Sequence, residues 1–208
     1  GFTITEWIDF ASNDGWGTHL MGDFNGDNKA DIASFHLSNG TWWVSESSGS
    51  SFTVDLWIDF AKAAGWSPHL VGDFNEDGKD DIASYHDSNG TWWVSLSDGN
   101  SFDVDLWADF FTTDGWSPQF VGDFNGDGRT DIANYYEGNG TWWVSEAVGG
   151  SFDVDLWADF FTASGWSAPI VGDVDEDGDD DIVNYFPGND SWWVSVSSGK
   201  AFTTPQWG

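Results

Sequence analysis

The sequence predicts an all-β protein, a β-propeller built of four four-stranded antiparallel blades. The segment covering residues 19–60 recurs three more times at a spacing of 50 residues, and a fixed period of this length is typical of repeat architectures. Each copy holds four short runs rich in β-branched and aromatic residues, separated by turn residues, and no stretch shows persuasive helical periodicity. Four antiparallel strands in a unit of this length match one propeller blade.

The second repeat illustrates the expected strands, which cover residues 69–74, 81–86, 91–96 and 101–107. In the last of them Phe102 and Val104 alternate with Asp103 and Asp105, as in a half-buried strand. Between the second and third strands lies Asn89-Gly90, the strongest short hairpin signal, because both residues tolerate positive φ. The run from Gly65 through Trp66 to Pro68 is expected to connect one blade to the next.

Paired tryptophans indicate how the blades pack. Trp92 and Trp93 are neighbours in the third expected strand, so their side chains point to opposite faces of the sheet. One indole would therefore fill each seam between blades. A single four-stranded unit is too small to bury two aromatic faces alone, so a string of independent small domains is disfavoured.

The chain is expected to form one domain over residues 1–208, with blades at approximately 18–60, 68–110, 118–160 and 168–207. Residues 1–10 match the fourth-strand pattern, and so do residues 202–207, which leaves one outer strand extra. It could close the ring from the opposite terminus or pair with another chain to give a homo-oligomer. The alternative architecture is half of an eight-bladed propeller formed by two chains.

Charge and composition exclude several classes of partner. The 36 acidic residues against 5 Lys and Arg give a formal net charge of −31, whereas nucleic acids and anionic membranes require a basic surface. No apolar run approaches the length of a membrane span, so no membrane insertion is expected. The aromatic content of 18% is enough for a large core, and no Cys is present to form disulfides.

A short acidic loop recurs in every repeat with the pattern Asp-x-Asn/Asp-x-Asp-x-x-x-Asp. Calcium takes six to eight oxygen ligands, mostly carboxylates and carbonyls, and alternate side chains of a tightly curled loop can supply them. The pattern predicts one Ca²⁺ per blade, about four in total, with the seventh position giving its backbone carbonyl. The expected ligands are Asp23, Asn25, Asp27, Lys29 and Asp31; Asp73, Asn75, Asp77, Lys79 and Asp81; Asp123, Asn125, Asp127, Arg129 and Asp131; and Asp173, Asp175, Asp177, Asp179 and Asp181.

The loop is not an EF-hand, because the twelfth position lacks the bidentate Glu and the flanks are strands. Glycine at the sixth position, as in Gly78, permits the sharp turn, and Asn28 replaces it in the first loop. The expected role of the metal is structural, to hold the first hairpin of each blade. Extracellular fluid supplies enough calcium for such sites, so a secreted protein is expected.

The motif at residues 71–85, VGDFNEDGKDDIASY, resembles the FG-GAP or VCBS repeat found in the integrin α-subunit propeller and in secreted microbial proteins. That resemblance implies a propeller with calcium bound at the loop positions just named. The chain is similar, more closely, to fungal and bacterial propeller lectins, through Gly115-Trp116, Val121-Gly122-Asp123 and Trp143-Val144-Ser145. Those lectins usually have about seven blades, so four blades are a departure.

Binding is better supported than catalysis. Tryptophan recurs in the expected connections between blades, at Trp16, Trp66, Trp116 and Trp166, where an indole beside polar groups could stack on a sugar ring, although packing of the seams would explain the same residues. The chain has no Cys nucleophile, and its four His occupy only two repeat positions. The sequence therefore predicts a non-enzymatic, multivalent lectin for glycans or glycoproteins. Alternatives are an integrin-like protein-binding adhesion module and a non-catalytic module of a secreted carbohydrate-active enzyme.

Overall fold

The computed structural model describes residues 6–7, 15–60, 65–109, 116–159, 169–203 and 206–207. These residues form strands and turns and contain no helix. The first two sheets comprise β1 (Trp16–Gly22), β2 (Asp31–His36), β3 (Thr41–Ser47) and β4 (Phe52–Asp59), then β5 (Trp66–Gly72), β6 (Asp81–His86), β7 (Thr91–Ser97) and β8 (Phe102–Asp109). The last two comprise β9 (Trp116–Gly122), β10 (Asp131–Tyr136), β11 (Thr141–Val148) and β12 (Ser151–Asp159), then β13 (Ile170–Gly172), β14 (Asp181–Phe186), β15 (Ser191–Ser197), β16 (Phe202–Thr203) and β17 (Gln206–Trp207).

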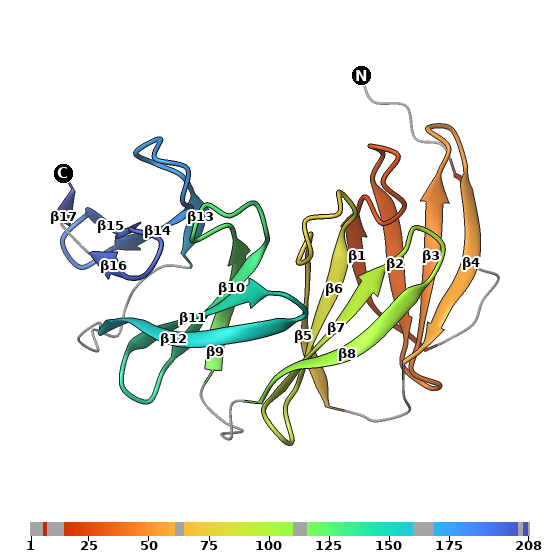
Figure 1. Ribbon diagram of the computed structural model, residues 1–208, viewed down its shortest axis with the longest axis horizontal. Helices are drawn as coiled ribbons and strands as arrows, with labels where there is room; N and C mark the ends of the chain where they lie inside the picture. Colours follow the sequence, from red (N-terminus) through yellow and green to blue (C-terminus); the bar gives the residue numbers. More distant parts are fainter. Residues whose placement is uncertain are drawn as a thin grey trace.

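Each repeat folds into one antiparallel sheet whose strands follow chain order, which confirms the predicted all-β repeat architecture. The four sheets succeed one another from the orange blade of β1–β4 to the blue blade of β13–β17 (Figure 1). In the fourth sheet the outermost position is divided between β16 and β17, which both pair with β15.

Two local predictions need correction. The first strand of the second blade begins at Trp66 rather than His69, because a register shift between these residues lets the strand continue through the segment expected to be a connection. The hairpin after β6 occupies residues 87–90, the gap left between the two expected strands, and Gly90 N donates to His86 O at 3.0 Å, but the expected positive φ is met at only one residue of the Asn-Gly pair. Gly90 has a φ of 71°, whereas Asn89 does not adopt a positive φ.

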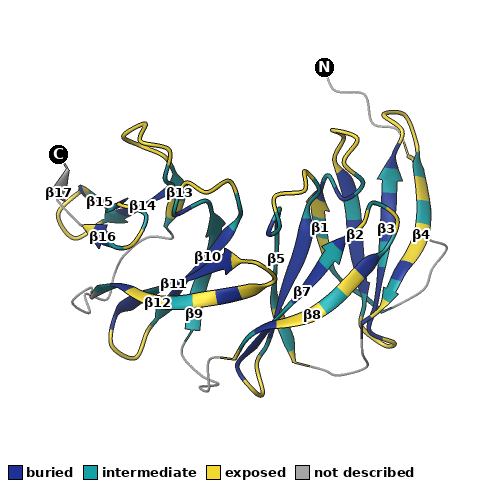
Figure 2. Cartoon of the chain, viewed as in Figure 1, coloured by how far each residue is buried: buried dark blue, intermediate teal, exposed yellow. Residues whose placement is uncertain are grey.

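The core lies in the seams between blades, and its buried residues, dark blue in Figure 2, recur along the strands of every sheet. Trp92 is fully buried in the seam between the second and third blades, and Trp93 packs against the seam between the first and second. This confirms the prediction from the tryptophan pair. The reason is the strand period of two, which directs adjacent indoles to opposite faces of β7.

The first and fourth sheets have no contact among the described strands, so these strands form an open series (Figure 1). The predicted extra strand at residues 1–10 lies almost wholly outside the described residues. Its Trp7 is described, and the ring centroids of Trp7 and Phe52 are 5.1 Å apart. No helix in the described part of the chain is long and apolar enough to span a membrane.

Candidate metal-binding loops and aromatic junctions

The acidic loop joins the first two strands of each blade, and its side chains fold inward onto its own backbone. In the first loop Asp23 Oδ1 accepts from Asp27 N at 3.0 Å, and Asn25 Oδ1 accepts from the same N–H at 3.0 Å. Asp27 Oδ1 accepts from Lys29 N at 2.9 Å. The second and third loops repeat these bonds, so the side chains at the first and third positions meet at the fifth N–H, and the fifth side chain accepts from the seventh.

The curl requires two left-handed backbone positions in each loop. The sixth position was predicted from its glycine, and Asn28 and Gly78 adopt φ of 63° and 82° there. The fourth position is left-handed as well, with φ of 74° at Gly26 and 62° at Glu76. Sequence reasoning missed it, although glycine at this position in two of the four loops is the signal that could have revealed it.

The fourth loop differs from the other three in the residue at its seventh position. Lys29 Nζ lies 2.6 Å from Asp27 Oδ2, and this hydrogen bond lowers the pKa of Asp27 and raises that of Lys29. Lys79 and Arg129 make the same ion pair in their loops. The fourth loop has Asp179 instead, whose pKa is raised by burial and by neighbouring carboxylates. The loop with the most negative charge is therefore the one without an internal cation at this position.

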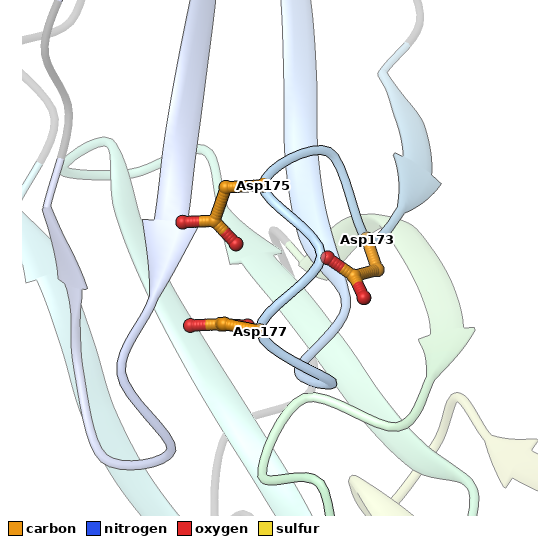
Figure 3. Close-up of side chains that lie close together, drawn as sticks. All are labelled: Asp173, Asp175 and Asp177. Carbon is orange, nitrogen blue, oxygen red and sulfur yellow. The ribbon is translucent and has the colours of Figure 1, made fainter.

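In the fourth loop the carboxylates of Asp173, Asp175 and Asp177 face one another, with oxygens within 4.8 Å (Figure 3). The three side chains are exposed, so a cation from solvent can reach them. Clustered carboxylates repel one another unless a positive charge lies between them. Their oxygens are the donor type that calcium prefers, so the residues fit the predicted ion.

The ninth-position aspartates are buried beneath the loops. Asp31, Asp81, Asp131 and Asp181 all have zero exposure, and in each the Oδ1 atom accepts from a backbone N–H near the end of the third strand, at 2.7–2.8 Å. Burial raises the pKa of Asp81 and Asp131 to about 7. Asp31 Oδ2 and Asp131 Oδ2 are buried without a hydrogen-bond partner. Such an orphaned carboxylate oxygen is costly unless a cation pairs with it, which again fits a metal.

The tryptophans predicted to contact sugars lie at the opposite ends of the strands. Trp66 begins β5, and its ring lies 4.5 Å from that of His86, 6.4 Å from that of Trp93 and 4.6 Å from that of Phe60 in the preceding blade. Trp16 and Trp116 make corresponding contacts within their own blades, and Trp166 lies outside the described residues. All three described rings are partly buried, so they pack the junctions while keeping some exposed surface.

Polar groups surround each of these aromatic junctions. Trp93 Nε1 donates to Thr91 Oγ1 at 3.0 Å, and Thr91 Oγ1 donates to Asn89 Oδ1 at 2.7 Å. The same relay recurs in the other three blades, with Ser191 replacing threonine in the fourth. Ser88 Oγ and His86 Nδ1 lie 3.0 Å apart beside the relay, where Ser88 is exposed and His86 is half-buried. Hydroxyl, amide and imidazole groups thus lie next to an indole, a combination that can bind sugar hydroxyls.

The acidic loop and the aromatic junction lie far apart within a blade. The first strand runs from the junction tryptophan at one end to the acidic loop at the other, and seven residues of strand span roughly 20 Å. An ion in the loop could not touch a ligand at the junction of the same blade. Its effect there would be to stabilise the hairpin that carries the junction residues.

Fold and loops together define a repeat protein of propeller-like blades, each carrying one acidic β-hairpin loop. Residues 23–84, 73–134 and 123–184 each match the FG-GAP-like repeat, and the chain belongs to this family. No curated protein matches the sequence.

A solved structure extends the similarity from repeat to whole chain. The chain is similar to an Agrocybe aegerita lectin described for specific recognition of non-reducing terminal N-acetylglucosamine, with a TM-score of 0.76 and 26% identity. The match covers 95% of this chain and 53% of that one, so the present chain spans about half the length of the lectin.

Proposed function

We propose that this protein is a calcium-stabilised, multivalent lectin that binds glycans at its blade junctions and has no catalytic activity of its own. The similarity to a terminal N-acetylglucosamine-binding lectin over 95% of the chain carries the proposal. The partly exposed indole beside a polar relay, present at Trp16, Trp66 and Trp116, supports the location. Several weak sites on one rigid body would act together on a glycoprotein or a cell surface through avidity.

Calcium has a structural role in this proposal. The side-chain oxygens at the first, third and fifth positions would hold the ion, with the buried ninth aspartate beneath, as its orphaned oxygen in Asp31 and Asp131 suggests. The bound ion would supply positive charge that removes carboxylate repulsion. Because such sites fill where calcium is plentiful, an extracellular location is part of the proposal.

A glycan array tests the binding function. The chain, in calcium buffer, is applied to glycans ending in N-acetylglucosamine, galactose or sialic acid, with expected binding to the N-acetylglucosamine set. Absence of binding to every glycan would contradict the lectin proposal and favour a protein partner.

Paired variants test the location of the site. Trp116→Phe keeps the junction filled but shrinks the ring available for stacking, so it should weaken binding. Trp107→Phe is the matched control, because Trp107 is 4% exposed in a seam and should not touch a ligand. If both variants bind like the wild type, the lectin proposal survives but its placement at the junctions is wrong.

A further inference from the structure

Each seam between blades joins two different faces of the repeat. One side is the forward face of a blade, formed in the first blade by Phe24, Phe35 and Trp42. The other is the backward face of the next blade, formed in the second blade by Ile82 and Phe102, with Val71 packed against them. The other two seams join corresponding residues in the same order. The open series of described blades therefore ends in one forward face and begins with one backward face.

The forward face of the fourth blade is uncovered. Trp192 is 48% exposed, whereas Trp42, Trp92 and Trp142 at the same repeat position are 0–3% exposed. Val174 is 40% exposed, whereas Phe24, Phe74 and Phe124 at its position are at most 1% exposed. The tilted stacking of Tyr185 on Trp192, with centroids 5.0 Å apart, nevertheless matches that of Phe35 on Trp42 in the first seam. The aromatic half of a seam is thus already assembled.

The backward face of the first blade is uncovered as well. Met21 is 69% exposed, and His19 is exposed. In the second blade the equivalent His69 lies in the first seam, with its ring 5.3 Å from Phe35 and 5.0 Å from Trp42. A forward face of the Tyr185 and Trp192 type offers His19 the same pair of rings.

The glycine that ends the first strand of each blade indicates that the two uncovered faces are complementary in shape. A Cβ on Gly22 would lie 2.9 Å from Val71 Cγ1 of the next blade, and one on Gly122 would lie 2.9 Å from Val171 Cγ1. Glycine is needed there because the neighbouring blade approaches the backbone closely. Gly172 is the counterpart in the fourth blade, yet nothing lies within 4 Å of its Cβ position. Met21 is the counterpart of the valines that face those glycines.

Hydrogen bonds across the seams also support pairing of the two uncovered faces. Asp80 N donates to Asp23 O across the first seam at 2.9 Å, and Ser97 Oγ donates to Phe24 O. Thr130 N and Asp180 N repeat the first bond, and Ser197 Oγ repeats the second. On the uncovered faces the corresponding donors are Ala30 N and Ser47 Oγ, and the corresponding acceptors are the carbonyls of Asp173 and Val174.

We propose that a second copy of this chain covers both faces, with the forward face of each copy on the backward face of the other. The same head-to-tail contact is then used twice about a two-fold axis and closes a ring. Two copies give eight blades, within the four to eight that closed propellers typically have. The contact repeats a seam that this acidic chain already forms three times internally, so its net charge does not prevent it.

Trp7 fits this arrangement. Its ring lies 5.1 Å from Phe52, as Trp57 lies 4.9 Å from Phe102 in the first seam. In the fourth blade Gln206 pairs with Trp193 as Leu106 pairs with Trp93, but Trp207 pairs with Trp192, where the second blade has Ala108. Trp7 thus lies against Phe52 where the first seam places the outer-strand tryptophan of the preceding blade, Trp57, against Phe102.

Cross-linking tests the proposed contact. The chain has no cysteine, so Val174→Cys and Phe52→Cys introduce single thiols. Their counterparts in the first seam, Phe24 and Phe102, have ring centroids 5.9 Å apart. Oxidation of an equal mixture of the two variants should give a disulfide-linked dimer, and either variant alone should give much less. A mixture that cross-links no better than the single variants overturns the proposal.

Light scattering measures the assembly. In calcium buffer the wild type should have about twice the 22.9 kDa chain mass. Gly172→Val adds a side chain in open space, so it should leave the fold intact and give a monomer; Trp192→Glu is the second break. Leu106→Glu is the control, since Leu106 is 48% exposed on an outer strand, and it should remain dimeric. A monomeric wild type, a larger assembly, or a dimer that both face variants leave intact would each overturn the proposal.

Discussion

Lowering the pH should destabilise the protein through His69. Burial in the seam between the first two blades lowers its pKa from 6.5 to about 4. The folded protein therefore favours the neutral imidazole, and the unfolded chain binds more protons between these two values. The stabilisation is fully present above pH 6.5 and is lost as the pH falls towards 4.

The magnitude follows from the width of that window. Between pH 6.5 and pH 5 the unfolded imidazole is protonated over 1.5 pH units while the folded one is not, and each unit is worth about 1.4 kcal/mol. The contribution of His69 to the free energy of unfolding should therefore fall by about 2 kcal/mol from pH 7 to pH 5.

Urea unfolding at pH 7 and pH 5 measures this difference. His69→Gln is a suitable variant because Gln119 occupies the same repeat position in the third blade. The variant should lose about 2 kcal/mol less than the wild type over this interval. His36→Gln is the control, because the His36 ring joins an exposed hydrogen bond with Ser38. An unchanged pH dependence in His69→Gln, or an equal change in both variants, would refute the reasoning.

Four further outcomes are expected. Chelation of calcium should lower the melting temperature, since a ligand that binds only the folded state stabilises it, and an unchanged melt would contradict the metal proposal. Asp131→Asn should weaken calcium binding measured by calorimetry, because the buried charge is lost; unaltered titration would argue against this ligand. Trp92→Ala should cost about 3–5 kcal/mol in urea unfolding, and the half-exposed Leu106→Ala less than about 1.5 kcal/mol; equal costs would refute the seam as core. Gly122→Val should lower the melting temperature because its Cβ would meet Val171, and a neutral result would contradict the close approach.

The regular parts of the fold were predictable because the side-chain pattern determines them. Residues 81–86 form the expected strand, since Ile82 and Ala83 face opposite seams and Asp81 begins the strand. The first strand was predicted too short, because Gly65 and Pro68 indicate a connection when the register shift that accommodates them is unknown.

The loops were predicted in part. Spacing alone was enough to place the first, third and fifth side chains of the fourth loop, Asp173, Asp175 and Asp177, close together. Spacing does not show that Asp131 is buried and accepts a hydrogen bond from Ala147 N, or that Lys29 forms an ion pair with Asp27. Both depend on contacts that the repeat pattern does not encode.

The ends of the series could not be predicted. Trp92 and Trp192 occupy the same repeat position in similar sequence surroundings, yet one is buried and the other is half-exposed. The difference comes from the presence or absence of a following blade within the described chain, which a periodic sequence does not reveal.

The central claim is that the blade junctions of this FG-GAP-like protein bind sugar. A crystal grown in calcium and soaked with N-acetylglucosamine tests it most directly. The account predicts density for a pyranose ring against the indole of Trp66 or Trp116, beside the neighbouring polar relay. Sugar density only elsewhere on the blades, or none at saturating sugar, would contradict it.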